Sequence, residues 1–407
     1  PGRNFPSLNE ATILDLDNMR SQRIYENFSV QFHDNVVEDN ILAPINPNSA
    51  LLVIGKSNSS TGFSLYFDAN LFRGNQVHTV DRTSGAIVIQ GVYTHVITRN
   101  VINDHGEKSN NIKNTPDRAF GVLVKIQYGA DGLDSTKKAE VRDSAKRVKL
   151  FFYNQFNRNT VLRNILEITD SSQKMLLRPK DDPNNKEYTY EDFLLIDAVV
   201  MRNNASYHSS LIRLEDAPHT FLTRMSLQQN CAGIIQGSYV SRSNGLIFLA
   251  KSKIFKNSLG TQSSGLFSGV FSELFLFNND IEKNIQDACD LGELEAGSDS
   301  SLFELRATTG KPAKMGSFKN RYVDNKNFYS GAIWNCVNCT LRDQNSIFYN
   351  NQASSWGGVG LISRGARMTT LGSLYANNFS TKGGSGFQVE SEAEITIDEC
   401  DFIANGS

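Results

Sequence analysis

The sequence has few of the features that assign a chain to a functional class at once. Its 407 residues include only six histidines, and none of these is spaced as a metal-binding pair. Charges nearly cancel, with 41 Lys and Arg against 43 Asp and Glu, so composition gives no argument for a nucleic-acid partner. The longest apolar runs, such as residues 120–124, are too short to cross a bilayer. We therefore expect no nucleic-acid binding and no membrane span in this segment.

A repeat dominates the rest of the sequence. An aromatic residue, two spacers and an asparagine recur at Tyr322–Asn325, Phe348–Asn351, Tyr375–Asn378 and Phe402–Asn405. The steps from 322 to 348, from 348 to 375 and from 375 to 402 are 26, 27 and 27 residues. Weaker copies end at Asn279, Asn257, Asn230, Asn203, Asn154, Asn100 and Asn75, and we interpret the three steps near 50 residues as two periods each. A fixed period of this length indicates a solenoid.

Apolar residues within the repeat alternate as they do in a β-strand. One face of the last full repeat holds Phe387, Val389, Ser391, Ala393, Ile395 and Ile397. A strand that short cannot bury its apolar side alone, so copies must stack about 4.8 Å apart. The sequence therefore predicts an all-β fold, a right-handed parallel β-helix with roughly 22–27 residues per turn and a few inserted loops.

The repeated residues have structural roles in such a helix. We expect one interior stack of aromatic rings, formed by Tyr322, Phe348, Tyr375 and Phe402. Asparagine tolerates left-handed backbone, and its amide both donates and accepts hydrogen bonds. The repeat therefore predicts an asparagine ladder at a tight bend, formed by Asn325, Asn351, Asn378 and Asn405.

Small-residue steps accompany the repeat and make it resemble a known family. Gly357-Gly358 follows Phe348–Asn351, and Ser330-Gly331-Ala332-Ile333 follows Tyr322–Asn325. This pairing of FxxN with GGxI-like steps resembles the repeats of polymorphic outer membrane proteins and related pectin-lyase-like β-helix surface proteins. The resemblance is closest over residues 317–407. It implies a surface-exposed, adhesin-like β-helix, and it supplies no catalytic residues.

The repeat also suggests how the chain is organised. Residues 1–70 are expected to form a less regular N-terminal β region or cap, and residues 71–407 the parallel β-helix. Three stretches break the rhythm and predict inserted loops, near 104–118, 133–147 and 280–315. The last of these is acidic, and we interpret it as a solvated loop rather than as a calcium or partner site.

Covalent modification is predicted at two kinds of residue. The N-glycosylation acceptor pattern occurs at Asn27, Asn58, Asn204, Asn338, Asn378 and Asn405. The last two are also repeat asparagines and could not carry sugar if they lie in a ladder, so the first four are the better candidates. Cys336 and Cys339 form a CxxC pair without a second pair for zinc, which leaves a local disulfide or two free thiols.

Catalysis has little support in the sequence. Polysaccharide lyases on β-helices need a calcium-binding carboxylate cluster with a basic residue, and hydrolases need carboxylates facing each other across a groove. The Gly-His-Gly and Asn-Thr-Asp signatures of polygalacturonases are absent. Asp398, Glu399 and Asp401 are the densest carboxylates in a repeat, but no basic residue lies in phase with them. We expect no catalytic residue, no metal and no cofactor.

The predicted function is therefore structural. We expect a glycosylated extracellular or cell-surface scaffold that serves as an adhesin or as a subunit of a filament or surface assembly. Its partners would be further copies or other surface proteins, because the repeat stops at Ser407 and a β-helix edge is a template for another strand. Two alternatives stay open. A carbohydrate-active lyase or hydrolase needs a carboxylate cluster with a basic residue in a lateral groove, and a passive carbohydrate-binding surface needs outward aromatic residues in register, for which Trp334 and Trp356 are the only tryptophans.

Overall fold

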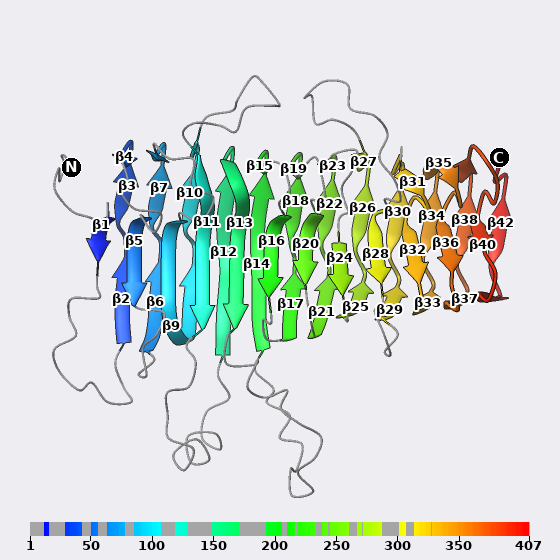
Figure 1. Cartoon of the computed structure of the whole chain (residues 1–407), viewed down its shortest axis with the longest axis horizontal. Coiled ribbons are helices and arrows are strands. Elements are labelled where there is room, and N and C mark those ends of the chain that lie inside the picture. The colour runs from blue at the N-terminus through cyan, green and yellow to red at the C-terminus, as the bar shows by residue number, and fades with distance from the viewer. Residues whose placement is uncertain are drawn as a thin grey trace, which may run out of the picture.

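Each strand pairs with the strand one turn further along the chain, and every pairing between described strands is parallel. The turns, here called rungs, stack along the long axis of the molecule (Figure 1). The prediction of an all-β parallel β-helix is confirmed. The computed structural model describes residues 12–15, 29–42, 50–55, 63–77, 85–106, 119–128, 148–170, 193–205, 210–215, 219–232, 238–242, 245–259, 267–270, 272–286, 301–306, 313–326 and 328–406.

Three sheets run along the body, and the rungs contribute strands to each in turn. Sheet A contains β2 (Ser29–His33), β6 (Phe63–Asp68), the second half of β9 (Gly85–Thr98), the first halves of β12 (Val148–Asn157) and β14 (Phe193–Met201), β17 (His219–Thr223), β21 (Gly245–Ala250), β25 (Ser272–Phe277), β29 (Ala313–Phe318), β33 (Cys339–Gln344), β37 (Arg367–Leu371) and β41 (Glu394–Asp398). Sheet B contains β3 (Val36–Glu38), β7 (Leu71–Arg73), β10 (Val101–Asn103), the second halves of β12 and β14, β18 (Ser226–Gln228), β22 (Lys253–Phe255), β26 (Asp280–Glu282), β30 (Arg321–Val323), β34 (Ile347–Tyr349), β38 (Leu374–Ala376) and β42 (Asp401–Ile403).

The third sheet returns the chain to sheet A. Sheet C contains β1 (Thr12–Asp15), β5 (Ala50–Gly55), the first half of β9, β11 (Phe120–Tyr128), β13 (Thr160–Asp170), β16 (Ser210–Glu215), β20 (Ser238–Arg242), β24 (Phe267–Val270), β28 (Phe303–Arg306), β32 (Trp334–Val337), β36 (Gly360–Ser363) and β40 (Phe387–Val389). Shorter strands lie between sheets B and C, namely β4 (Ile41–Leu42), β8 (Gln76–Val77), β15 (Asn204–Ala205), β19 (Cys231–Ala232), β23 (Ser258–Leu259), β27 (Ile285–Gln286), β31 (Phe328–Ser330), β35 (Gln352–Trp356) and β39 (Phe379–Ser380).

A ladder of hydrogen bonds ties the rungs together at the end of sheet B. The side-chain oxygen of Asn351 accepts from the backbone N–H and the side-chain amide of Asn325, at 3.2 and 3.0 Å. The Asn351 amide donates to Asn378 Oδ1 and to the Tyr322 carbonyl, both at 3.0 Å. All the hydrogen-bonding capacity of the buried amide is thereby used. This first ladder contains Asn40, Asn75, His105, Asn159, Asn203, Asn230, Asn257, Asn284, Asn325, Asn351, Asn378 and Asn405.

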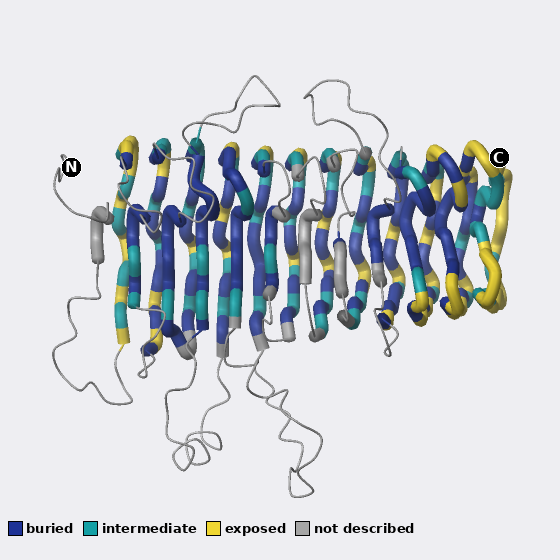
Figure 2. The backbone as a smooth tube through the Cα atoms, in the orientation of Figure 1, coloured by how far each residue is buried: buried dark blue, intermediate teal, exposed yellow. Residues whose placement is uncertain are grey.

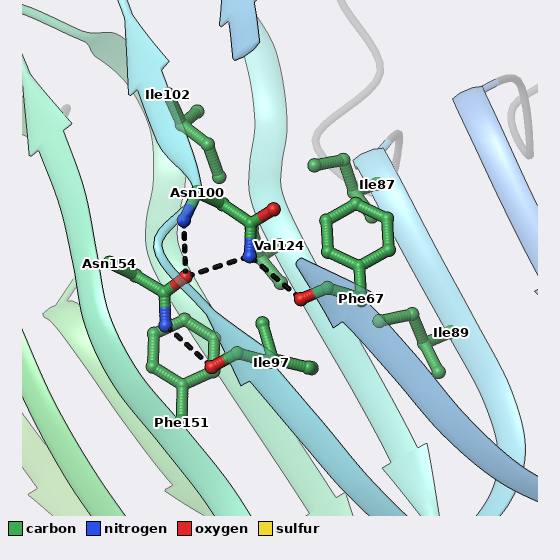
Figure 3. A pocket seen from close by; sticks show the side chains of 9 residues that line it. All are labelled: Phe67, Ile87, Ile89, Ile97, Asn100, Ile102, Val124, Phe151 and Asn154. Carbon is green, nitrogen blue, oxygen red and sulfur yellow. Dashed lines mark hydrogen bonds between the residues drawn. The ribbon is translucent and has the colours of Figure 1, made fainter. Parts of the chain in front are cut away.

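A second ladder lies five residues earlier, at the start of sheet B. Asn100 donates from its backbone and its amide to Asn154 Oδ1, at 3.1 and 2.9 Å (Figure 3). Towards the C-terminus serine and then cysteine replace asparagine, and each still accepts from a backbone N–H one rung away. The hydrogen-bonded members are Asn35, Asn70, Asn100 and Asn154, and then Ser252, Asn279, Asn320, Ser346, Ser373 and Cys400.

The left-handed backbone conformation that was predicted for the ladder asparagines occurs instead at the residue before each of them. Asp324, Asn350, Asn377 and Ala404 have φ values of 55°, 54°, 54° and 49° and precede the four ladder asparagines. Such backbone is unfavourable for a residue with a Cβ atom. The bend is therefore made by the preceding residue, and the following asparagine holds it through hydrogen bonds. That part of the prediction was wrong.

The two ladders also explain the irregular steps in the sequence repeat. Asn75 and Asn203 belong to the first ladder, whereas Asn100, Asn154 and Asn279 belong to the second. Within one ladder the step is 26 or 27 residues over regular rungs and 30 to 54 residues where a rung is longer. β10 pairs directly with β12, so a step near 50 residues is one long rung rather than two. The range of 22–27 residues per rung was therefore too narrow.

The core is a set of side-chain columns inside the three sheets. Buried residues accordingly recur on successive rungs along the body (Figure 2). In the middle column of sheet B, the rings of Tyr322, Phe348, Tyr375 and Phe402 stack with centroids 4.8, 4.7 and 4.7 Å apart. The first three are fully buried, and Phe402 is 45 % exposed because it lies in the last described rung. The column continues towards the N-terminus through Ile281, Ile254, Leu227, Val200, Phe156, Ile102, Phe72 and Val37.

A small interior cavity lies where smaller side chains interrupt two columns. In sheet A, Ile97 stands between Phe67 and Phe151, and in sheet B, Ile102 stands between two phenylalanines. Both isoleucines line the cavity, together with apolar side chains and the ladder amides of Asn100 and Asn154 (Figure 3). The amides are already hydrogen-bonded, so this cavity is a packing gap rather than a polar binding site.

Several predicted boundaries fall differently in the structure. The last repeat is two strands, β40 and β41, because the chain turns at Glu392 with φ 64°, so its residues 387–397 do not share one face. Regular pairing begins before residue 71, since β2 pairs with β6. β26 (Asp280–Glu282), β27 (Ile285–Gln286) and β28 (Phe303–Arg306) lie inside the predicted third insertion, because Ile281 and Asn284 occupy core and ladder positions. Most of the first insertion and all of the second lie outside the described residues.

Removing one ladder amide should destabilise the fold strongly. Asn351→Ala leaves the Asn325 N–H and one hydrogen of the Asn325 side-chain amide buried without an acceptor, at about 1–3 kcal/mol each. We expect the urea midpoint of unfolding to fall accordingly. Asn350→Gly is the matched control, because glycine adopts the left-handed backbone of position 350 easily. This variant loses only the part-buried side-chain hydrogen bond from Asn350 to Asp324, so the midpoint should change little. Equal effects of the two variants would contradict the ladder's role.

The aromatic stack gives a second stability test. Phe348→Ala removes a fully buried ring that lies between two others and should lower the unfolding free energy by about 3–5 kcal/mol. The neighbouring Ile347 is 41 % exposed on the outside of the same strand, so Ile347→Ala should cost less than about 1 kcal/mol. Chemical denaturation of both variants decides the point, and a loss at Phe348 no larger than at Ile347 would count against the stack.

Candidate binding surface

The predicted chemical residues are not assembled into a site. Asp398 ends β41 on sheet A and Asp401 begins β42 on sheet B, with Glu399 at the bend between them. All three are exposed in the last described rung. Among the described residues no group of three or more His, Cys, Asp or Glu side chains could hold a metal ion. The carboxylates therefore point to opposite sides of a corner rather than into a shared groove.

The glycosylation candidates occupy different environments. Asn338 is exposed at the corner between sheets C and A, and Asn204 is partly exposed in β15. Asn378 is fully buried in the first ladder, where its amide donates to Asn405 Oδ1 at 3.0 Å. A sugar on Asn378 would have to break this ladder. Asn27 and Asn58 lie outside the described residues.

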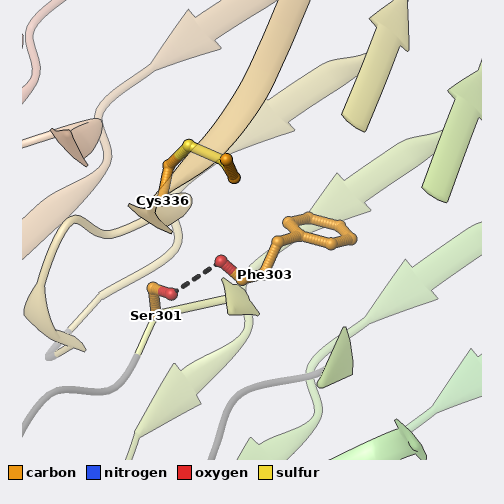
Figure 4. Close-up of a disulfide and its surroundings, with 4 residues drawn as sticks. Ser301, Phe303 and Cys336 are labelled. Carbon is orange, nitrogen blue, oxygen red and sulfur yellow. Dashed lines mark hydrogen bonds between the residues drawn. A yellow bond between two sulfur atoms is a disulfide. The ribbon is translucent and has the colours of Figure 1, made fainter. Parts of the chain in front are cut away.

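The CxxC pair forms a disulfide at the same corner (Figure 4). Cys336 is an inward residue of β32, Cys339 begins β33, and their Cα atoms are 5.5 Å apart. Cys231 is disulfide-bonded as well, whereas Cys400 is a free thiol in the second ladder. Disulfides persist chiefly in oxidising compartments.

One buried cluster of titratable groups lies at the start of sheet A. His95 Nε2 accepts from the Tyr128 hydroxyl at 2.8 Å, and His95 Nδ1 donates to the Leu150 carbonyl at 3.0 Å. The Lys149 ammonium lies 4.3 Å from the centre of the Tyr128 ring. Burial lowers the pKa of His95 to about 3, so its imidazole is neutral at ordinary pH. The three side chains are nearly inaccessible and satisfy one another, which suits a structural role.

A second polar cluster replaces the apolar column of sheet A near the C-terminal end. Ser317, Asp343 and Thr370 continue the column that begins with Phe32 and Phe67. Asp343 Oδ2 accepts from the hydroxyls of Ser373 at 2.6 Å and Thr370 at 3.3 Å. Its other oxygen has no hydrogen-bond partner. Burial raises the pKa of the Asp343 carboxyl, although the neighbouring hydroxyl groups act to lower it.

Sheet C carries a column of charges on its outer side. Glu167 lies between Lys125 and Arg213 on the adjacent rungs, and its carboxylate is 3.5 Å from the Lys125 ammonium. Arg163, four residues earlier, is 3.9 Å away. The two carboxylates described in this column, Glu167 and Glu304, lie four rungs apart on the same side of the sheet, so they are not the facing pair that a glycoside hydrolase uses. The alternating charges suit cross-rung ion pairing.

The outer side of sheet A is different, because it carries an apolar column. Its middle outward column, here called the apolar stripe, consists of Val96, Leu150, Leu195, Phe221, Phe248 and Phe275. All six side chains are partly exposed. The rings of Phe221 and Phe248 are 5.7 Å apart, and Phe277 beside the stripe is 37 % exposed. The sheet thus presents a row of apolar side chains one rung apart on its solvent side.

The stripe ends at a glycine and gives way to polar residues. A Cβ atom on Gly316 would lie 2.6 Å from Phe275 and 2.8 Å from Phe318, so both rings lie over the glycine backbone. On the following rungs the same column holds Arg342, Thr369 and Thr396. The apolar stripe is therefore a bounded patch on an otherwise polar sheet. The sequence signal was the dipeptide Phe-Leu at 221, 248 and 275, which our reading of the repeat missed.

Comparison with known proteins adds no relative. No protein-family model, no curated protein and no solved structure matches this chain. Among the residues described, no helix is long and apolar enough to cross a membrane.

The buried carboxyl gives a pH test. A pKa raised in the folded state means that folding favours the protonated acid, so Asp343 contributes most stability below its unfolded value of about 3.9. That contribution is lost as pH rises towards the folded pKa. Asp343→Asn should remove this dependence and should be more stable than the wild type at pH 8, by about 1.4 kcal/mol for each unit of upward shift. If the unfolding free energies of the two proteins changed with pH in the same way between pH 4 and 8, the prediction would be wrong.

Proposed function

We propose that this chain is a non-catalytic β-helix scaffold that packs side by side with a second copy of itself through the apolar stripe. The observation that carries the proposal is the register of Leu195, Phe221, Phe248 and Phe275, which repeat on consecutive rungs of sheet A. An exposed apolar patch rimmed by polar residues is a mark of an interaction site. A flat sheet face of this kind packs against another sheet at about 10 Å.

The chemistry of the stripe favours a protein partner. Its side chains are purely apolar, without the polar groups that orient a small ligand or a sugar. The only tryptophans do not contribute, because Trp334 is buried in the core and Trp356 lies on β35. The partner therefore has to be an apolar surface of similar length.

A second copy meets that requirement without further assumptions. Its own stripe repeats at the same spacing of about 4.8 Å, so the side chains of the two stripes stay in register along the whole contact. Two identical patches related by a two-fold axis form a self-complementary interface. With the stripes antiparallel, the polar columns beyond Val96 and Phe275 lie outside the contact.

Two features support a secreted or cell-surface location for this scaffold. The Cys336–Cys339 disulfide is typical of oxidising compartments. Asn338 beside it is an exposed acceptor for N-linked sugar, at a corner two rungs beyond the stripe. A glycan there leaves the stripe free. The resemblance to surface-exposed β-helix proteins agrees with this location.

Self-association is the direct test. Analytical ultracentrifugation of the wild type should show a dimer that dissociates on dilution. Phe248→Lys places a charge at the centre of the stripe and should shift the protein to monomer, weakening association at least about 100-fold. Thr369→Lys is the matched control, because it lies in the same outward column but beyond the patch. A wild-type protein that stays monomeric up to about 100 μM would overturn the proposal.

A further inference from the structure

Three lysines gather around one aromatic ring at sheet B and the bend that follows it, and a fourth lysine stands at the bend before sheet B. The ammonium groups of Lys253, Lys256 and Lys283 lie 5.1, 5.2 and 5.8 Å from the centre of the Phe255 ring. Lys251 stands at the bend that begins the same rung. All four lysines are exposed, and Phe255 is partly exposed. We call this group the lysine cluster.

The carboxylates beside the lysine cluster are already engaged. Asp280 Oδ1 and Glu282 Oε2 on the next rung lie 2.7 and 3.3 Å from the Arg321 guanidinium, and Glu282 also pairs with Lys283 at 3.3 Å. Within the described part of the chain, Lys251, Lys253 and Lys256 form no ion pair with a carboxylate. Three of the four cluster lysines therefore lack a direct ion-pair partner among the described residues, although Asp280 stands opposite Lys253 on the next rung.

The backbone conformation at these bends does not favour lysine. Lys251, Lys256 and Lys283 have φ values of 50°, 52° and 56°, a region that glycine and asparagine adopt more easily. Lysine at these bends adds backbone strain and also like-charge repulsion between neighbours. Cation–π contact with one exposed ring returns only about 0.5–1 kcal/mol for each lysine. A bound anion would remove the repulsion.

We propose that the lysine cluster binds an acidic polysaccharide, carboxylated or sulfated. The lysines pair with its acidic groups, and Phe255 packs against the apolar face of a sugar ring between them. Proteins that bind single-stranded nucleic acid combine a longer basic track with several stacking aromatics. Here the Phe255 ring and three unpaired lysines lie on one rung, and the carboxylates of Asp280 and Glu282 limit the basic patch on the next rung. A short run of acidic sugars fits this footprint.

The site is independent of self-association. The lysine cluster lies on sheet B, around the corner from the apolar stripe on sheet A, so a chain that pairs through the stripe keeps its lysines accessible. A scaffold of paired β-helices would then carry one polysaccharide site on each copy. Loss of dimerisation in Phe248→Lys should leave polysaccharide binding by each chain unchanged.

Titration calorimetry with polygalacturonate and with dextran sulfate tests the proposal, with neutral dextran as the blank. Lys253→Gln/Lys256→Gln should weaken binding about tenfold and reduce the salt dependence. Lys314→Gln/Lys382→Gln, on other surfaces, is the charge-matched control and should bind as the wild type does. The two polymers distinguish carboxylate from sulfate recognition.

A second variant separates sugar recognition from charge alone. Phe255→Ala keeps every lysine, so it should weaken binding of the acidic polysaccharides several-fold and leave binding of inorganic polyphosphate unchanged. Thermal unfolding of each variant checks that it is folded. Equal affinity of the wild type and the double lysine variant would overturn the proposal. Tighter binding of single-stranded oligonucleotides than of either acidic polysaccharide would assign the cluster to nucleic acid instead.

Discussion

The paired asparagine ladders are the constraint on which the rest of this structure depends. Each buried amide joins three rungs, because it accepts from one neighbour, donates to the next and also donates to a carbonyl of the rung before. A carbonyl or N–H group left unpaired in this interior would cost about 1–3 kcal/mol. The ladders thus hold the sharp bends that residues such as Asp324 and Asn350 adopt at the expense of backbone strain.

The ladders also determine where the chain is free to vary. Their positions stay five residues apart from Asn35 and Asn40 to Cys400 and Asn405, so the three-residue strands of sheet B never change length. All variation in rung length, from 26 to 54 residues, lies in the rest of the rung. The outer sides of the three sheets are correspondingly different. Sheet A carries the apolar stripe, sheet B the lysine cluster and sheet C the ion pairs around Glu167.

The sequence predicted the fold because the ladder leaves a period that can be read directly. Tyr322, Phe348, Tyr375 and Phe402 could be placed in one column from spacing alone, since inward residues recur once per rung. The second ladder was missed because serine and cysteine replace asparagine at Ser346, Ser373 and Cys400, where any hydrogen-bond acceptor suffices.

The surfaces were harder to predict, because a residue on the outside is under no packing constraint. The aromatic residues of the stripe precede inward leucines, and a single sequence does not show which of two adjacent apolar residues faces out. The lysine cluster joins Lys253 with Lys283 from the next rung, a neighbourhood that only the register of β22 and β26 reveals.

Native-state hydrogen exchange is the most direct test of the ladders. The backbone N–H groups of Asn325, Asn351 and Asn378 donate to side chains rather than to a sheet partner. In an ordinary loop, amides without a sheet partner exchange quickly. The account predicts that they exchange as slowly as the central strand amides and open only with global unfolding. Exchange of these three amides as fast as that of an amide without a hydrogen bond would contradict it.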